Sequence, residues 1–468
     1  MRARLPSMLS AFLLALPILV EAEPLKPASP PALPSEDVEV EVNDPKLKAD
    51  IEDALQRGVA WLKARQLPTG AWPGFVPSPV YASSATSANG QPELSALALL
   101  ALLKCGVAPT DPCIVKGLAY IQKQDFISTG GYGPAIALMV IEAKYASKEA
   151  IAGKKGQKAA KPKPITPSPE DFTWATKMTN QLIGCQSKIG GWRYAVPPAD
   201  MAEGKLGYAD VSNTQYALMG LKTARRLGIP VKAEAFARAV DFLLDQQEAD
   251  GKAWTRITRR KEKEEKVQDS TASGYADKAR GFPYMKGAAA AFEASASGSM
   301  TCAGLVGLLI CRSEMLDDPK FPERAKRLPK VEQAIWDALA WLDAHWNVTE
   351  NPSRYDREYE VGYYLYALER VGVMADLRML GPGHDWYMEG AGTWIARLNK
   401  DPEAIAKTLG GKPDPKALAG MGFWAFSNCL EKAETQDTPY ALLFLRKASI
   451  KLGYSVEDAT PAPKKQSP

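Results

Sequence analysis

One pattern recurs six times along this 468-residue chain and constrains its fold more than any other feature. In each copy, a helical stretch ends in aromatic or aliphatic residues, often followed by Gln. A turn with a Gly-aromatic pair comes next, and a second helical stretch of small apolar residues follows. The third copy is the clearest, with Gln186, then Gly190-Gly191-Trp192, then the stretch 210–227. Self-similarity on this scale is typical of supersecondary units that stack and share one core.

The apolar residues within the copies fall at helical spacing. Ala217, Leu218, Leu221 and Ala224 would lie on one helix face, and no run of alternating β-branched residues is present. The first stretch of each copy is amphipathic, which suits an outer layer, and the second is apolar nearly all round, which suits an inner layer. Six such hairpins close naturally into a ring. The sequence therefore predicts an all-α fold, an (α/α)6 toroid of six inner/outer helix hairpins with a central cavity.

The domain organisation follows from the extent of the repeat. We expect one toroid domain over residues 46–452, after a Pro-rich leader at 23–45 and before a polar tail at 453–468. Residues 148–169 are rich in Lys, Ala and Pro and predict a basic linker between the second and third hairpins. Residues 259–296 form an insertion within the fourth hairpin, expected to project from one end of the ring.

The first 22 residues indicate an exported protein. Arg2 and Arg4 precede the apolar run Met8–Val20, and Val20-Glu21-Ala22 offers small residues where a signal peptidase cuts. This run is shorter than the ~20 residues that span a bilayer. No later run reaches that length without Gly or charge. We expect cleavage of a signal peptide near Ala22, a periplasmic or secreted location, and no transmembrane segment.

The cysteines leave the question of disulfides open. Cys105 and Cys113 are near neighbours across a turn, and export would permit a bond between them. Cys302 and Cys311 are ~13.5 Å apart along a predicted helix, too far to bridge each other. In a chain of this length, however, Cys is more often a small buried hydrophobe.

The charge distribution argues against nucleic acid as a partner. The net charge of the whole chain is +4. The segment 148–163 contributes +5, from six Lys and one Glu, and residues 1–22 contribute +1, so the rest of the chain carries −2. A nucleic-acid-binding domain needs a basic face of its own, which this toroid lacks.

The repeat, with its Gln followed by Gly-x-Trp, resembles the prenyltransferase and squalene-cyclase repeat over residues 46–452. The segments Asp210–Leu218, Gly298–Leu305 and Gly383–Tyr387 are similar to those of exported, planctomycete-type bacterial members. This resemblance implies the terpenoid cyclase/protein prenyltransferase α/α toroid, in agreement with the ring argued above. It implies little about the reaction, because function belongs to sites rather than to folds.

The chemistries of that family require groups that this chain lacks. Squalene-type cyclases protonate an alkene with an Asp-x-Asp-Asp acid, but here only Asp210 is kept and Ser212 stands at the proton-donor position. Protein prenyltransferases bind zinc through Asp, Cys and His. Neither His345 nor His384 stands at the head of the last inner helix, and Ser212 replaces the Cys. We therefore expect no squalene-type cyclisation, no metal and no cofactor.

The heads of the inner helices are expected to gather at one end of the cavity, where their free N–H groups favour a polar or anionic ligand group. Asp210 is the first catalytic candidate, as a general acid or ligand anchor, and Asp437 is the second. The candidates for ligand contact are Trp192, Tyr194, Asn213, Thr214, Tyr284, Ser299, Thr301, Tyr355, Glu360, Tyr363, Tyr364, His384, Trp386 and Trp424. A structural interpretation stands beside these assignments. Asp210, Ser299 and Asp437 suit helix caps, and the Gly-aromatic pairs suit the joining of outer helices to turns.

Three functional hypotheses remain open. In the first, the cavity binds an apolar isoprenoid-type ligand, and any enzyme activity is that of a related cyclase or transferase. In the second, the toroid binds or cleaves a polysaccharide through Asp356, Glu358 and Glu360, which would require paired carboxylates roughly 5–10 Å apart. Glu358 and Glu360 are two positions apart and would point to different sides of a helix. In the third, the ring is a non-catalytic scaffold for a protein partner.

Overall fold

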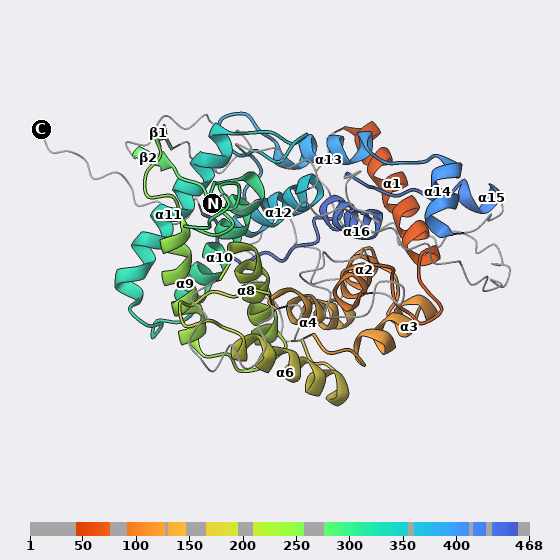
Figure 1. The fold of residues 1–468 in the computed structure, drawn as a ribbon, viewed down its shortest axis with the longest axis horizontal. Helices are drawn as coiled ribbons and strands as arrows, with labels where there is room; N and C mark the ends of the chain where they lie inside the picture. The colour runs from red at the N-terminus through yellow and green to blue at the C-terminus, as the bar shows by residue number, and fades with distance from the viewer. Residues whose placement is uncertain are drawn as a thin grey trace, which may run out of the picture.

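The computed structural model describes residues 44–74, 91–126, 130–146, 165–194, 209–256, 276–353, 360–410, 415–426 and 433–456. Six helices form a closed inner ring in which each packs against the next and the last packs against the first (Figure 1). In ring order, these are α2 (Pro92–Lys104), α4 (Tyr132–Tyr145), α8 (Val211–Arg226), α10 (Gly298–Asp317), α12 (Val361–Met374) and α16 (Glu434–Leu445).

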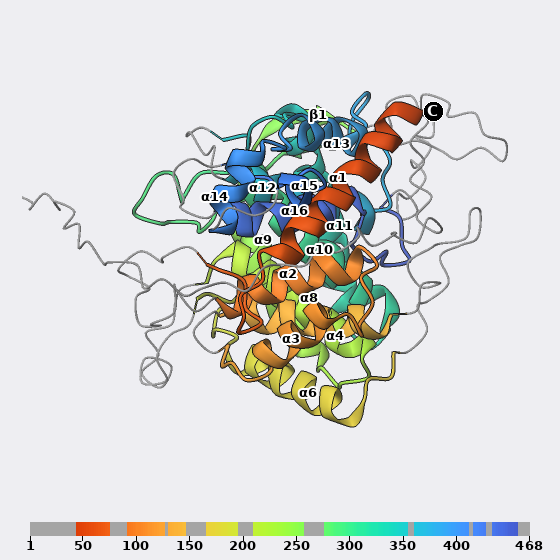
Figure 2. The same ribbon diagram turned by 90° about the vertical axis from the view of Figure 1, so that its right-hand side faces the viewer.

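An outer layer surrounds this ring, and Figure 2 shows two of its helices, α1 and α3, on the outside of α2. The outer helices are α1 (Pro45–Ala64), α3 (Pro112–Ile121), α6 (Pro169–Gly184), α9 (Ala233–Gln246), α11 (Arg324–Ala344) and α13 (Trp386–Ala396). Outer helices α1, α6, α9 and α13 contact α2, α8, α10 and α16, the inner helices of their own hairpins, whereas α3 and α11 pack against the preceding inner helices α2 and α10. The chain between α13 and α16 also contains the short helices α14 (Pro402–Leu409) and α15 (Pro415–Leu418). The prediction of an all-α (α/α)6 toroid is confirmed.

Burial separates the two layers. Every residue of α2 from Leu94 to Leu103 is buried, whereas α1 buries one face that includes Ile51, Leu55 and Leu62. Of the described helices, only α10 has the length and composition of a membrane span, and 94% of its apolar window is buried. Its place in the inner layer explains that composition.

Proline and capping residues start several helices. Asp44, Asp111, Ser168 and Asp401 each accept a hydrogen bond from a first-turn N–H group, and a proline follows each one directly. The fixed φ of proline suits the first helical position, and the cap satisfies a donor that the helix leaves free.

The repeated tryptophans link an outer helix to the inner helix of the same hairpin, and we call these sets of contacts the joints of the ring. The indole N–H groups of Trp72, Trp192 and Trp424 each donate to an outer-helix carbonyl, at 2.7 Å in all three cases. The backbone N–H of each of these residues donates to a hydroxyl on the next inner helix. Those hydroxyls belong to Ser95, Thr214 and Thr438, at distances of 3.0–3.1 Å.

The glutamines at the ends of the outer helices complete the joint. The Nε2 group of Gln186 donates to Gly190 O at 2.7 Å and to Ala235 O of the next outer helix at 2.8 Å. Gln66 and Gln247 bind two carbonyls in the same way. Gly190 has φ +99°, and a Cβ there would lie 2.2 Å from Arg238 O, so this turn requires glycine.

Two short antiparallel strands, β1 (Lys252–Thr255) and β2 (Ala276–Ala279), were not predicted. Strand β1 precedes the insertion and β2 lies within it, and the pair is fixed to α11 by Arg280, which pairs with Asp337 at 2.5 Å. The charged segment 261–266, the signal peptide, most of the leader and tail, and 148–164 of the basic linker lie outside the described residues. Those expectations therefore stay predictions. Cys105 and Cys113 are free, buried thiols, and burial raises the pKa of each to about 12.

Candidate functional site

Asp210 caps α8, and both of its carboxylate oxygens accept hydrogen bonds. Its Oδ1 accepts from the backbone N–H of Asn213 at 2.6 Å, and its Oδ2 accepts from Asn213 Nδ2 at 2.9 Å. The Tyr284 side chain also bonds to this carboxyl. Burial raises the pKa of Asp210 to about 7, against the opposing effect of these hydrogen bonds. Asn213 is itself tied to the backbone, because its Oδ1 accepts from Gly131 N at 3.0 Å. The structure thus brings three expected site residues together, but as a helix cap.

Asp437 has one carboxylate oxygen that remains available. It lies in the first turn of α16, and its Oδ2 accepts from the backbone N–H of Phe426 at 2.8 Å. Its Oδ1 lies against Gly362 of α12, where an added Cβ would approach to 2.4 Å. Within the described chain, no donor is bonded to that oxygen. Burial, helped by the charge of Glu434, raises the pKa of Asp437 to about 7.

Ser299 and Glu360 also meet, through a residue that the sequence did not single out. The Glu360 Oε2 atom accepts from Asn351 Nδ2 at 2.9 Å and from Ser299 Oγ at 3.1 Å. The Asn351 Oδ1 atom accepts from Ser299 N at 2.8 Å. Asn351 therefore joins the heads of α10 and α12, and these polar groups largely satisfy one another.

A second group of side chains lies deeper, between the inner helices. We call it the arginine–tyrosine cluster, and it consists of Tyr132, Tyr216, Tyr363, Tyr366, Arg370 and Tyr440, from α4, α8, α12 and α16. The Arg370 guanidinium carbon lies 4.0 Å from the ring centre of Tyr366, 5.1 Å from that of Tyr216 and 5.9 Å from that of Tyr363. The Tyr440 ring stacks on Tyr366 at 5.1 Å. The cluster thus places one cation among several aromatic rings.

Neutral hydrogen-bond partners connect the cluster. With its amide oxygen toward the guanidinium, Gln215 accepts from Arg370 Nε at 3.1 Å and Nη2 at 3.2 Å, and donates to the Tyr363 hydroxyl at 3.1 Å. The Ser212 hydroxyl bonds to the hydroxyls of Tyr363, at 2.7 Å, and Tyr132. A continuous set of hydroxyl and amide groups therefore runs from Tyr132 to the buried guanidinium.

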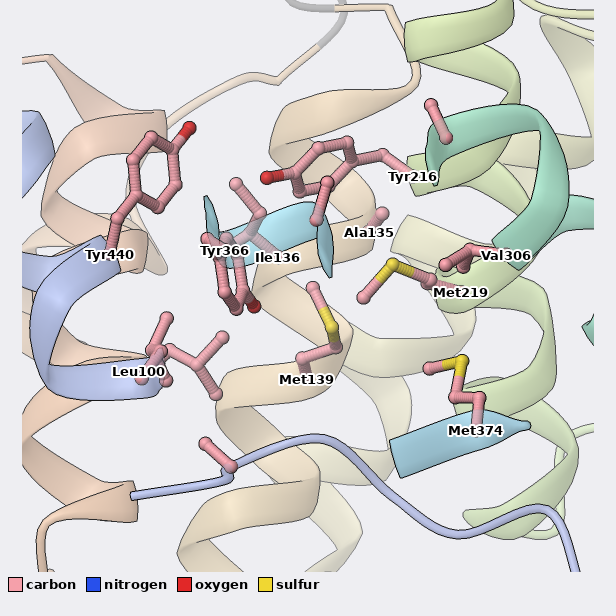
Figure 3. Packing of buried hydrophobic residues seen from close by; sticks show 14 of the residues in the cluster. Leu100, Ala135, Ile136, Met139, Tyr216, Met219, Val306, Tyr366, Met374 and Tyr440 are labelled. Atoms are coloured by element: carbon pink, nitrogen blue, oxygen red, sulfur yellow. The ribbon is translucent and has the colours of Figure 1, made fainter. Parts of the chain in front are cut away.

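Apolar side chains lie further along the ring axis. Figure 3 shows Leu100, Met139, Met219 and Met374 directed toward the space between the inner helices, beside Tyr216, Tyr366 and Tyr440. Met139, Met219 and Met374 keep exposed fractions of 8%, 6% and 6%, although neighbours such as Leu138 and Leu218 have none. Part of each methionine side chain therefore stays open to solvent. The centre combines aromatic and charged groups with a flexible apolar surface.

Several of the expected ligand contacts lie outside the cluster, in the wall and the outer layer. Trp192 and Trp424 are fully buried in the wall between the layers, with their indole N–H groups bonded to outer helices. Trp386 is a buried outer-helix residue that donates to Leu377 O at 2.7 Å. His384, also in the outer layer, stacks on Trp346 at 4.6 Å. None of these four side chains faces the cluster, because each is used to hold the outer layer.

The remaining candidates divide between the joints and the cluster. Thr214 and Thr301 accept backbone N–H groups of the preceding turns. Tyr194 stacks on Tyr132 at 5.5 Å, next to the cluster that contains Tyr363. Tyr364 is buried, and among the described residues its hydroxyl has no hydrogen-bond partner. Tyr355 lies outside the described residues.

Arg370 and Gln215 are the central residues that the sequence analysis missed. Each lies in a helix whose apolar residues fit an ordinary core. The signal that marks Arg370 is the charged pair Glu369-Arg370 inside the otherwise apolar stretch Tyr363–Met374. A charge in an inner helix, well away from the helix ends, needs a partner or a role.

No protein-family model matches the chain, and a comparison with curated proteins finds no relative. Among solved structures, the chain is similar to a variant of a type II terpene cyclase from Scytonema in complex with geranylgeranyl dihydroxybenzoate. The identity is 12% and the TM-score 0.45, over 86% of this chain and 98% of that one. It is also similar to an unsaturated glucuronyl hydrolase specific for heparin, with 12% identity, a TM-score of 0.41, and coverage of 86% and 97%. The toroid assignment rests on the helix contacts above.

Proposed function

We propose that this toroid binds an apolar, isoprenoid-type molecule at the centre of its ring and does not cyclise it. The supporting observation is the surface formed by Leu100, Met139, Met219 and Met374 next to the tyrosine rings. Unbranched methionine side chains adapt to irregular apolar ligands, and aromatic rings add large contact areas. The start of the chain supports export of this binding protein, which remains part of the proposal.

The position of Arg370 opposes carbocation chemistry. Aromatic faces stabilise a developing cation, but here a permanent cation already occupies the space 4.0–5.9 Å from three of the rings. A second positive charge at about 5 Å would be repelled by about 3 kcal/mol at an effective dielectric constant of about 20. A cyclase that works through carbocations would be slowed by this arrangement, whereas a binding protein would not.

The carboxyl groups of Asp210 and Asp437, at the heads of inner helices α8 and α16, differ in the hydrogen bonds that they can still form. We call this end of the ring its mouth. Asp210 is saturated by Asn213 and Tyr284, so we assign it to capping. Asp437 keeps one oxygen free, and with a pKa of about 7 it can donate or accept a proton near neutral pH. We therefore prefer Asp437 as the mouth residue that would contact a polar ligand group or carry out proton transfer.

The polysaccharide hypothesis gains no comparable support. Glu360 uses its Oε2 atom to hold Asn351 and Ser299, and its expected partners Asp356 and Glu358 lie outside the described residues.

Native mass spectrometry of the protein purified from its own cells tests the proposal, followed by identification of the molecules released on denaturation. We expect an isoprenoid lipid. Met139→Trp and Met219→Trp should reduce its occupancy at least tenfold by filling the ring centre, at a stability cost of about 1–3 kcal/mol. Ile183→Trp, at an exposed position of outer helix α6, is the matched control and should retain the ligand.

Two results would contradict the proposal. A released oligosaccharide whose occupancy is unaffected by the Met139 and Met219 variants would favour the polysaccharide hypothesis. An empty protein at the mass of the mature chain, which also fails to take up added isoprenoids, would favour the scaffold hypothesis.

A further inference from the structure

The Arg370 side chain is a buried cation. It has no exposed surface, and among the residues that the structure describes no carboxylate lies within ion-pair distance of it. The neighbouring Glu369 is engaged elsewhere, because its carboxylate accepts from Ser449 N at 3.0 Å and Ser449 Oγ at 2.6 Å. The hydrogen-bond partners of Arg370 are Gln215, Tyr216 and Tyr366, and all three are neutral.

Other buried arginines in this protein are compensated. Arg256 pairs with Asp277 at 2.5 Å, and Arg312 pairs with Glu332 at 3.4 Å. An uncompensated buried charge is strongly unfavourable, since neutral dipoles replace only part of its hydration. The three tyrosine rings offset part of this cost, but they do not neutralise the charge.

We infer that Arg370 binds an anionic group, a carboxylate or a phosphate, on the ligand of the ring centre. This inference rests on the proposed function and names the chemical class of that ligand as an anionic amphiphile. Guanidinium is the side chain best suited to both groups, because its planar N–H fork matches their oxygen atoms.

The rest of the cluster favours the same charge. Burial raises the pKa of Tyr363, Tyr366 and Tyr440 above the usual value, so their hydroxyls stay protonated and can donate to an anion. The apolar part of the ligand would lie along Met139 and Met374. A cationic head group would meet a like charge, and a neutral alcohol would leave the charge of Arg370 uncompensated.

Three probes of equal chain length separate these cases. The full chain is titrated with farnesol, farnesoic acid and farnesyl monophosphate, and with the geranylgeranyl series, by quenching of tryptophan fluorescence at pH 8 and low salt. We expect the acid or the phosphate to bind about 10- to 100-fold tighter than the alcohol, the range for hydrogen bonds to a charged group. The tighter of the two anions identifies the head group.

The variants assign this preference to Arg370. In Arg370→Met the alcohol should bind as in the wild type, and the preference for the anion should disappear. Arg370→Lys keeps the charge and should keep most of the preference. Arg312→Met is the matched control, because it removes a buried but paired arginine at the far end of α10 and should retain the preference. Circular dichroism verifies that each variant is folded.

The outcomes are distinct for the two proposals. If the wild type binds alcohol and anions equally, Arg370 does not bind an anionic group, while isoprenoid binding stands. Retention of the preference by folded Arg370→Met also overturns the inference. If the wild type binds no member of either series, the proposed function fails, and the inference fails with it. The wild-type comparison decides the charge preference even if Arg370→Met does not fold.

Discussion

Replacement of Gln247 by Glu would test the joints of the ring with almost no change in shape. Gln247 is buried, and its Nε2 group donates to Arg280 O at 3.1 Å and to Ala334 O at 2.9 Å. It therefore ties the turn of the fourth hairpin to outer helix α11. In Gln247→Glu, an oxygen replaces this nitrogen, so a carboxylate would face two carbonyl oxygens.

The size of the effect depends on pH. At pH 5 the new carboxyl can stay protonated and donate to one carbonyl, so one hydrogen bond is lost, about 1 kcal/mol. Keeping a proton that the unfolded chain has mostly released at this pH costs about 1 kcal/mol more. At pH 8 it must either ionise against two acceptors or hold its proton. Each unit by which its folded pKa exceeds the unfolded value of about 4.3 costs about 1.4 kcal/mol. A rise of two to three units gives a loss of about 3–4 kcal/mol, on top of the lost hydrogen bond.

The sign follows from proton linkage. Because the folded pKa of the new group is raised, the folded variant binds more protons than the unfolded one above pH 4, and stability falls as pH rises through the folded pKa. For a chain of 468 residues, the entropy of unfolding is about 1 kcal/mol/K. The melting temperature should then be about 2 °C below the wild type at pH 5 and about 4–5 °C below it at pH 8.

Urea and thermal unfolding followed by circular dichroism at both pH values would measure this. Gln56→Glu, at an exposed position of α1, is the matched control and should stay within 0.5 kcal/mol of the wild type at either pH. An equal loss for Gln247→Glu at pH 5 and pH 8, or one no larger than the control, would refute the role given to these glutamines.

Three further predictions follow from single side chains. Thr214→Val removes the acceptor for the Trp192 N–H group and should lower the free energy of unfolding by about 1–3 kcal/mol in urea, while exposed Thr173→Val should change it little. Burial raises the pKa of Asp437 to about 7, so wild-type stability should fall as pH rises from about 4 to 7. Asp437→Asn should reduce that slope, and an unchanged slope would assign it to other groups. Burial raises the pKa of Cys105 to about 12, so a thiol reagent at pH 8 should label it only after unfolding; fast labelling of the native protein would contradict this.

The toroid could be predicted because its joints are local and repeated. Gln186, Gly190 and Trp192 lie within seven positions of one another, and each makes a contact that recurs in other hairpins. Local spacing with a short period is visible in one sequence without an alignment. The same property explains why Trp192 was a poor candidate for ligand contact, since its indole N–H group is already used by the joint.

The polar residues at the heads of the inner helices indicate a ligand site less reliably than expected, for a related reason. Polar residues at Asp210, Thr214, Ser299 and Thr301 suggested a ligand mouth, but the N–H groups that make helix ends attractive to anions also attract nearby side chains. In the structure, Asp210, Thr214 and Thr301 serve caps and turns, and the Ser299 hydroxyl bonds to Asn351 and Glu360. Asp437 is the exception, because within the described part of the chain only one of its oxygens accepts a hydrogen bond.

The central cluster could not be found from local spacing, because its members come from four helices between Tyr132 and Tyr440. Only ring closure brings them together, and each is unremarkable in its own helix. Arg370 alone breaks the pattern, since a core packed around Tyr366 and Met374 gains nothing from an unpaired charge. If the ring centre were merely a core, replacing Arg370 by an apolar residue of similar size would relieve a cost at no loss. A cation held there by neutral groups is best explained by an anion that arrives with a ligand.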